Sequence, residues 1–356
     1  MKQSVLFALF AAALFGAAMP FAKRLLGNID PLLLAGLLYL GSGLGLTLAR
    51  VVRDHGWKAS NLPQTDRLWL VGAIGFGGVL APIALLFGLK RIDAGVASLL
   101  LNLEAVLTAL LAWLVFSENA DRRVVVGMAA IVIGGIVLSS PTGPVAQGDW
   151  SGPALVALAC LCWAIDNNFT RKVASADALF VAGSKGVIAG ITNTLLATAA
   201  GTRLPSLDVA ASALLLGLAG YGISLVLFVL ALRGLGAART GAYFSTAPFI
   251  GAAISVVWLG ETTSPVFWIA GVLMAVGVWL HLTEHHEHEH SHEALVHSHR
   301  HTHDEHHQHA HDEPVDLQHP HEHVHAHAKM KHSHAHYPDI HHQHDHGLVK
   351  CPPTSQ

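Results

Sequence analysis

The amino-acid sequence predicts an all-α integral membrane protein with ten transmembrane helices, arranged as two inverted five-helix repeats, followed by a disordered C-terminal tail. Three observations lead to this prediction. The 356 residues are 52% hydrophobic and only 13% Asp, Glu, Lys or Arg, whereas soluble domains usually carry about 25% charged residues. Up to about Thr283 the apolar residues fall into long runs. Beyond Thr283 the chain is polar and crowded with histidine.

Ten apolar runs are long enough to cross the hydrocarbon core of a bilayer, which takes roughly 20 residues per helix. Several tryptophans lie at or near the run ends, as in the aromatic belts of membrane proteins. The first run exceeds the apolar core of a secretory signal peptide, about 7–15 residues, so we expect it to be retained as a helix. The predicted spans are residues 4–22, 31–49, 68–89, 93–116, 124–140, 153–170, 178–200, 209–232, 237–259 and 265–282.

The second half of the chain repeats the first half at low identity, with matching segments in the same order. Five spans per copy is an odd number, so the second copy starts on the opposite side of the membrane and the copies are inverted. Inverted repeats place a binding site between them near the bilayer midplane and permit alternating access. We predict a first repeat over 1–140, a second over 141–283 and a tail over 284–356. The matching segments are 14–24 with 162–172, 75–77 with 220–222, 89–90 with 232–233, and Glu118 with Glu261.

Lys and Arg are unevenly distributed over the segments that connect the predicted spans. With the N-terminus in the cytoplasm, ten of them lie in inside segments and five in outside loops. The positive-inside rule therefore predicts that both termini are cytoplasmic in a plasma (inner) membrane. Glu118 and Glu261 end their spans at opposite faces, where we expect them to anchor the helix ends at the interface.

One predicted span in each half carries a recognisable pattern. Residues 96–104 (VASLLLNLE) lead to residues 111–118 (LAWLVFSE) in the first half. Residues 246–248 (TAP) lead to residues 258–261 (WLGE) in the second half. The first pattern resembles the signature helix of the EamA family, part of the drug/metabolite transporter superfamily, and the second resembles its repeat copy.

The resemblance covers residues 4–282 and implies a ten-helix carrier without ATP hydrolysis, often an exporter of amino acids, metabolites or toxic compounds. Members of that family commonly have a proline early in this helix in both halves. Pro248 fits the pattern, but the matching position in the first half is Ala105. The resemblance therefore implies a proline-dependent break of the helix only in the second half.

Ionisable side chains inside membrane helices cost at least ~2.5 kcal/mol on insertion scales and usually face a cavity or a partner. Glu104 and Asp166 lie deep in their predicted spans, and Lys185 lies inside the seventh. We expect these residues to line a central solute cavity, in which Glu104 takes up and releases a proton. The alternative is a fixed ion pair of Glu104 or Asp166 with Lys185 that only orders the bundle. The predicted solute-binding residues are Glu104, Asn102, Asp166, Asn167, Lys185, Tyr243 and Ser245.

The C-terminal tail holds 25 histidines, many of them at alternate positions. With acidic residues interleaved and little apolar surface to bury, the tail is expected to be disordered when unliganded. In an extended chain, residues two apart point the same way, so each series presents several imidazoles, which suit Zn, Ni, Co and Cu. The alternative is a polar appendage with only incidental affinity for metal. The predicted metal ligands are His286, His288, His290, His292, His297, His299, His301, His303, His319, His321, His323, His325 and His327.

These features together predict a secondary transporter, expected to be an exporter, of a small metabolite, amino acid or drug-like solute, with a cytoplasmic metal-binding tail. One alternative is a transporter of a divalent metal such as Zn, Ni or Co, against which the lack of histidine in mid-membrane argues. Another is a non-transporting membrane metal store or regulator, although a single helix would suffice as its anchor.

Other classes of function find little support in the sequence. The net charge of −3 gives no sign of nucleic-acid binding. We find no nucleophile–base pair, phosphate loop or catalytic metal motif, so neither enzyme activity nor a required cofactor is expected. The expected partners are the solute, the lipid bilayer and divalent metal ions, and the sequence is compatible with a homodimer.

Overall fold

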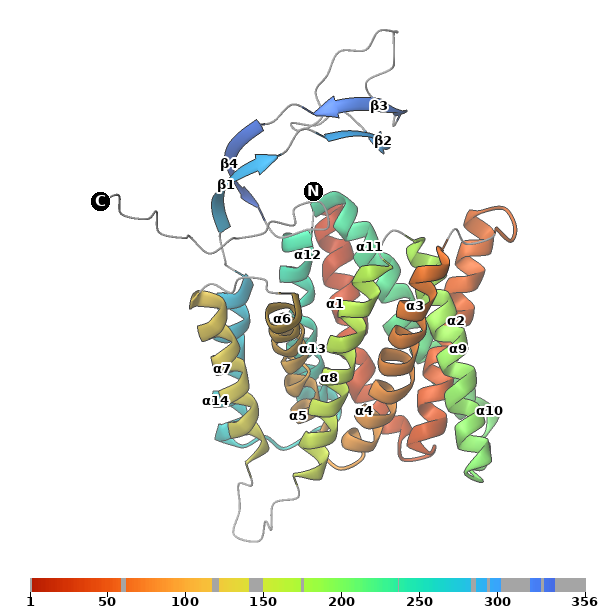
Figure 1. Ribbon diagram of the computed structural model, residues 1–356. Coiled ribbons are helices and arrows are strands. Elements are labelled where there is room, and N and C mark those ends of the chain that lie inside the picture. Colours follow the sequence, from red (N-terminus) through yellow and green to blue (C-terminus); the bar gives the residue numbers. More distant parts are fainter. Residues whose placement is uncertain are drawn as a thin grey trace. The chain divides into compact units, whose positions relative to one another are not determined.

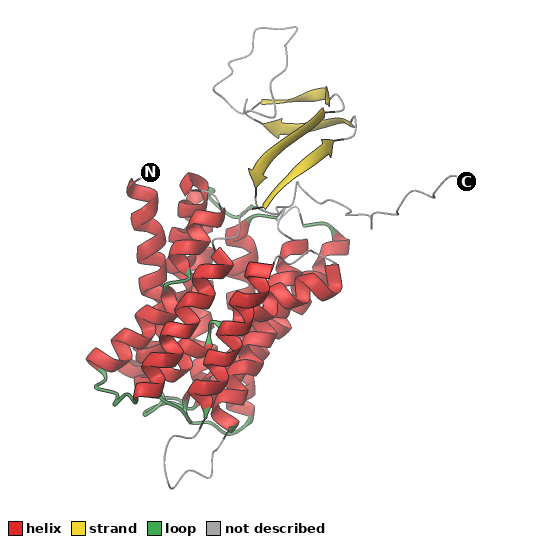
Figure 2. Ribbon diagram, turned by 90° about the vertical axis from the view of Figure 1, so that its left-hand side faces the viewer, coloured by secondary structure: helices red, strands yellow, loops and turns green. Residues whose placement is uncertain are grey.

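The computed structural model places the chain in two compact units, Met1–Glu284 and His285–Gln356. The first unit is a bundle of helices, and the strands belong to the second unit (Figure 1; Figure 2). The structure describes residues 2–58, 62–116, 122–140, 150–173, 176–235 and 237–282 and, in the tail, residues 286–292, 295–301, 321–327 and 330–336.

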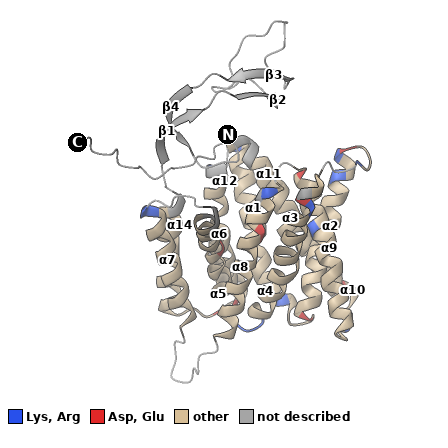
Figure 3. Cartoon of the chain, in the orientation of Figure 1, with Lys and Arg blue, Asp and Glu red and all other residues tan. Residues whose placement is uncertain are grey.

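The helical unit contains the ten predicted spans. Among the described residues, nine helical stretches are long and apolar enough to cross a membrane, and a tenth, from Pro265 to Leu280, is apolar but shorter. Lys, Arg, Asp and Glu lie mostly near the ends of the helices, with few between (Figure 3). This distribution matches a bundle whose middle is surrounded by hydrocarbon.

The third span of each half contains a π-helical segment, and the fourth span is divided into two helices. In the first half, α3, η2 and α4 form the third span, and α5 with α6 forms the fourth; in the second half these places belong to α10, η3 and α11, and to α12 with α13. The elements are α1 (Lys2–Leu25), α2 (Pro31–Arg53), η1 (Gln64–Asp66), α3 (Arg67–Ala73), η2 (Ile74–Leu80), α4 (Ala81–Leu89), α5 (Ala94–Leu100), α6 (Leu103–Phe116), α7 (Arg122–Ser139), α8 (Ser151–Lys172), α9 (Ala178–Ala199), α10 (Leu207–Gly217), η3 (Leu218–Ile223), α11 (Ser224–Leu235), α12 (Ala237–Phe244), α13 (Ala247–Trp258) and α14 (Pro265–Leu282).

The helices of the two halves pack against each other in a two-fold pattern. Equivalent spans meet as α2 with α9, α5 with α13 and α7 with α14. Contacts between non-equivalent spans also come in matching pairs. The third span of each half packs on the first span of the other half, as α4 on α8 and α11 on α1. The fourth span does the same, as α6 on α8 and α13 on α1. The apolar core runs through these contacts and includes the fully buried Leu34, Leu86 and Leu99. The packing therefore agrees with two copies of one five-helix unit.

The two halves run in opposite directions through the bundle. Lys23, near the end of α1, donates hydrogen bonds from its Nζ to the carbonyl oxygens of Leu89 and Ile92, both at 2.7 Å. Gly152, near the start of α8, lies against the same loop, since a Cβ on it would be 3.2 Å from Cβ of Arg91. The end of α1 and the start of α8 thus share one end of the bundle. We call it the Glu261 end, because Glu261 also lies there, and we call the opposite end the Arg50 end.

Both fourth spans are interrupted by a two-residue turn at equivalent positions, Leu101–Asn102 and Ser245–Thr246. In the second half Pro248 lies in the first turn of α13, as the resemblance implies. In the first half the break occurs without a proline. The Asn102 amide donates to the carbonyl of Leu99 at 2.8 Å, and the Ser245 hydroxyl donates in the same way to the carbonyl of Ala242, also at 2.8 Å. These side chains satisfy carbonyl groups where the helix stops.

The α2 and α9 helices approach each other closely through glycines. A Cβ on Gly186 would lie 2.6 Å from Cα of Gly43, and a Cβ on Gly190 would lie 2.6 Å from the backbone nitrogen of Leu40. Small residues at four-residue spacing allow such backbone contact between membrane helices. The second spans of the two halves therefore form a close joint between the repeats.

The described residues of the tail lie in short strands. Four strands form two antiparallel pairs, β1 (His286–His292) with β4 (Met330–His336) and β2 (Leu295–His301) with β3 (His321–His327). The alternation of histidine with other residues has the period of two that a strand requires. Of the predicted metal ligands, His303 and His319 lie outside the described residues. In the described strands, the backbone register places pairs of histidines opposite one another. The pairs are 286 and 336, 288 and 334, 290 and 332, 297 and 325, 299 and 323, and 301 and 321.

We predict that Gly186→Ala destabilises the protein by about 1–3 kcal/mol, as overpacking does in tightly packed interiors, because the new methyl group meets the α2 backbone. The thermal unfolding midpoint of detergent-purified protein measures the effect. Gly241→Ala is the matched control, since a Cβ there meets nothing within 4 Å. It should leave the midpoint unchanged or raise it, because alanine is the better helix former. Equal midpoints for G186A and the parent would contradict the close approach of α2 and α9.

Candidate functional site

A buried ion pair links the sixth and seventh spans of the bundle. Asp166 on α8 is 3% exposed, and its Oδ2 accepts from Nζ of Lys185 on α9. Its other oxygen, Oδ1, accepts from the Thr170 hydroxyl at 3.0 Å. The carboxylate occupies the space that a side chain on Gly77 of η2 would need. The pair therefore lies where α8, α9 and η2 meet.

Glu104 and Asn167 form a second polar contact beside this pair. The Asn167 amide, on α8, donates to Oε1 of Glu104 at 2.9 Å and to the Thr108 hydroxyl, on α6, at 3.4 Å. Asn167 is exposed and Glu104 is half-buried. Both Asp166 and Lys185 are near enough to Glu104 to interact with it electrostatically. Four of the seven predicted solute-binding residues thus gather at the junction of α6, α8 and α9.

The η2 segment supplies backbone carbonyls to the same region. The Gly77 carbonyl accepts from the Tyr39 hydroxyl at 2.7 Å and from Nε1 of Trp163 at 3.1 Å, while the Gly78 carbonyl accepts from the Asn193 amide at 3.1 Å. A π-helix is rare and is found mostly as single turns at functional sites. Our sequence reasoning missed η2, Trp163 and Asn193. The available signal was the glycine-rich run at residues 75–78.

A strip of aromatic side chains leads from this cluster into the second half of the chain. Tyr39 stacks on Tyr221 with ring centroids 6.0 Å apart. Phe15 contacts both Tyr221, at 5.9 Å, and Phe244, at 5.4 Å. Phe228 extends the strip with an edge contact to Phe244 at 4.9 Å. The polar cluster is therefore continuous, through Tyr39, with an aromatic surface contributed by α1, η3, α11 and α12.

The other three predicted solute-binding residues lie at the two helix breaks. Asn102 and Ser245 use their side chains to bond carbonyls of their own helices. Tyr243 precedes Phe244 of the aromatic strip, and its carbonyl accepts from the Thr246 hydroxyl at 2.6 Å. The hydrogen bonds described for these three residues run within their own spans and not to the charged cluster.

The equivalent contact in the other half of the bundle is apolar. In the alignment of 14–24 with 162–172, Asp166 corresponds to Ala18. There α1 packs on α13 through Gly16, which lies against the Ala247 carbonyl and would place a Cβ 3.1 Å from the backbone nitrogen of Gly251. Charged groups therefore occupy only one of the two symmetry-related helix contacts.

Metal ligands do not converge in the described part of the bundle. No three His, Cys, Asp or Glu side chains are grouped there in a way that could hold a metal ion. Cys160 and Cys162 are buried and carry free thiols, and the Cys160 sulfur lies 3.7 Å from the Leu100 carbonyl. The cysteines that a metal pathway through the bundle would use thus lie in apolar packing.

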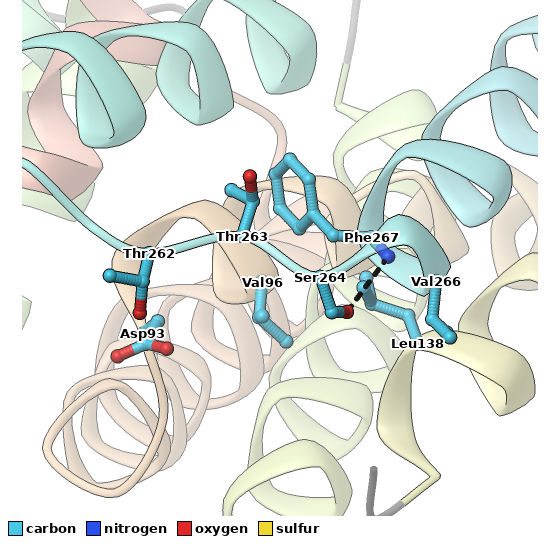
Figure 4. A pocket seen from close by; sticks show the side chains of 8 residues that line it. All are labelled: Asp93, Val96, Leu138, Thr262, Thr263, Ser264, Val266 and Phe267. Carbon is cyan, nitrogen blue, oxygen red and sulfur yellow. Dashed lines mark hydrogen bonds between the residues drawn. The ribbon is translucent and has the colours of Figure 1, made fainter.

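Glu261 does more than anchor a helix end at the interface. Its Oε1 accepts from the backbone nitrogen of Ala94 at 2.7 Å, and its Oε2 accepts from that of Gly95 at 2.8 Å. Its repeat counterpart, Glu118, lies outside the described residues. Beside these bonds is a pocket of about 350 Å³ (Figure 4). It is lined by Asp93, Val96, Leu138, Thr262, Thr263, Ser264, Val266 and Phe267.

Comparison with known families gives a match over both halves of the helical unit. The model of the EamA-like transporter family matches residues 2–140 and 150–283. A solved crystal structure, described only as that of a protein, superposes with a TM-score of 0.57 at 20% identity, over 78% of this chain and 94% of that one. At this identity the superposition shows a shared fold.

Curated relatives are similar over most of the helical unit. A protein of Methanothermobacter thermautotrophicus named as an uncharacterized transporter is 27% identical over 76% of this chain and 83% of its own length. An uncharacterized inner membrane transporter of Escherichia coli is 24% identical over 75% of this chain and 87% of its own. A Salmonella typhimurium protein named as a probable amino-acid metabolite efflux pump is 31% identical over 47% of this chain and 52% of its own.

We predict that Lys185→Met destabilises the protein by about 3–5 kcal/mol, because it leaves the Asp166 carboxylate buried without its partner. The double variant D166N/K185M should recover most of this loss, since neither charge then remains. Thermal unfolding of the purified proteins compares the two. A double variant no more stable than K185M would show that the two side chains do not stabilise each other.

Proposed function

Because the chain belongs to the EamA-like transporter family, we propose that it is a secondary exporter of a small polar metabolite of the amino-acid type. The chain is a multi-pass membrane transporter and not an enzyme. The name of the Salmonella typhimurium relative, an amino-acid metabolite efflux pump, supports this solute class and this direction of transport.

The observation that carries the proposal is the charged cluster at the junction of α6, α8 and α9. Glu104 and Asn167 are only partly buried by protein. A carboxylate at this depth is too costly to place in hydrocarbon, so we infer that it faces a water-filled cavity. The cavity offers both a carboxylate and the ammonium of Lys185, which complement the amino and carboxylate groups of a zwitterionic solute.

The two carboxylates of the cluster have different surroundings and, we infer, different roles. Asp166 is buried and paired with Lys185. Glu104 accepts one hydrogen bond from a neutral amide, and Lys185, which interacts with it electrostatically, is bonded to Asp166 instead. Glu104 is therefore the group that exchanges a proton with the cavity, and the proton couples export to the pH gradient.

The orientation follows from the charge distribution of the connecting segments. Ten Lys and Arg residues lie in segments on the Arg50 end and five in loops on the Glu261 end. By the positive-inside rule the Arg50 end and both termini are cytoplasmic. The plasma (inner) membrane is the corresponding location, in line with the name of the Escherichia coli relative.

The tail adds a metal-binding function on the cytoplasmic side of the membrane. An isolated two-stranded sheet is marginally stable in water, so metal bound between opposed histidines would stabilise the pairs that the backbone register allows. Neutral imidazole suits Zn, Ni, Co and Cu. In this proposal the metal is buffered or sensed by the tail and is not the transported solute.

We predict that Glu104→Gln removes the dependence of transport on the pH gradient and lowers the transport rate at least tenfold. Uptake of radiolabelled amino acids into inside-out vesicles, with and without an imposed gradient, measures this. Asp208→Asn makes the same chemical change at an exposed position in the first turn of α10 and should leave transport unchanged. Unaltered uptake and pH dependence in E104Q would end the proton-carrier proposal.

We predict that full-length protein binds several divalent metal ions per chain, whereas protein truncated after Thr283 binds none with comparable affinity. Calorimetric titration of both forms with Zn²⁺ tests this, and EDTA should release the metal. Affinity no tighter than that of short histidine peptides would leave the tail as a polar appendage.

A further inference from the structure

The carboxylate of Glu261 joins the two repeats at the Glu261 end of the bundle. It follows α13, in the second repeat, and accepts from the backbone nitrogens of Ala94 and Gly95, in the first. These are the first residues of α5, and negative charge is favoured at the start of a helix. Asp93, the residue before α5, makes no side-chain hydrogen bond to these nitrogens. The start of α5 is thus capped by Glu261, which is 167 positions away from Ala94 in the sequence.

The helix that Glu261 holds is a separate piece of its span. The turn at Leu101–Asn102 divides α5 from α6, so α5 can move at this end without carrying the whole span. Along its length α5 packs against α13. Ser98, one turn further in, is 1% exposed and lies against Gly251 of α13. Separation of α5 from α13 would therefore uncover Ser98.

The two ends of the solute pathway differ in this structure. Glu104 and Asn167, further toward the Arg50 end, are partly exposed. At the Glu261 end, the Glu261 bonds join the repeats, and Lys23 holds the carbonyls of Leu89 and Ile92. A carrier that alternates between its two sides has to break the connection at the closed end.

We propose that Glu261 is the gating residue of the Glu261 end: the pathway opens there only when its carboxylate releases the start of α5. The inference rests on the transport function and deepens it by naming the bonds that close one side. The pocket of Figure 4 is lined by Asp93 and Val96 from the first repeat and by Thr262 and Phe267 from the second. In this proposal the pocket is the outer mouth through which the exported solute leaves once the bonds break.

The sequence supplies the matching residue for the opposite end. Glu118 corresponds to Glu261, and Lys23 corresponds to Arg171 in the alignment of 14–24 with 162–172. Each repeat thus has a glutamate at the first of these positions and a basic residue at the second. Glu118 provides a control of identical chemistry, because its substitution should not open the Glu261 end.

The test measures how readily a thiol at position 98 reacts with a membrane-impermeant maleimide. Ser98→Cys is placed in a chain in which Cys160, Cys162 and Cys351 are replaced by alanine or serine, and reagent is added to each side of sealed vesicles in turn. The separate variant Thr262→Cys, exposed at the mouth, identifies which side faces the Glu261 end. We expect E261Q to raise the labelling rate at position 98 from that side about tenfold, the change that ~1.4 kcal/mol produces.

Two further variants complete the design. E118Q should leave the labelling rate from that side at or below that of the parent, and E261D, which keeps the carboxylate, should lie closer to the parent than E261Q. An unchanged rate in E261Q, or an equal rise in E118Q, would overturn the proposal. The labelling assay requires no solute, so it tests the gating role of Glu261 independently of the proposed proton exchange at Glu104. A faster labelling rate in E261Q together with normal transport in E104Q would support the first proposal and contradict the second.

Discussion

The structure depends on a single requirement of its surroundings, that a charge inside the membrane must have a partner. Asp166 meets this requirement through Lys185 and Thr170. Its carboxylate fits only because residue 77 is a glycine. The same glycine belongs to η2 and offers its carbonyl to Tyr39 and Trp163. The ion pair, the π-helix and the aromatic strip are therefore one connected arrangement that adjoins Glu104.

Much of the fold could be predicted because the bilayer imposes simple lengths and a simple chemistry on a chain. Ten apolar runs gave ten spans, and charged residues inside those runs led directly to Glu104, Asp166 and Lys185. The π-helix, the Trp163 and Asn193 bonds and the capping of α5 by Glu261 were not predictable, since each depends on backbone groups that only tertiary packing brings together. The helix break at Asn102, which occurs without a proline, was not predictable for the same reason.

The two repeats differ in chemistry at the contacts of the fourth span of one repeat with the first span of the other. At one contact, α6 meets α8 through Glu104 and Asn167; at the equivalent contact, α1 meets α13 through Gly16 and Ala247. The first contact is polar and partly open, while the second is apolar and close. Both contacts join the first repeat to the second, and only the contact of α6 with α8 carries the charged cluster.

The π-helical segments η2 and η3 lie in the third span of their respective halves. A π turn holds one residue more than the α turn it replaces, and that residue rotates everything beyond it by about 100°. Both third spans contain such a segment, so in each half the part of the span beyond it presents a different face to its neighbours than an uninterrupted α-helix would.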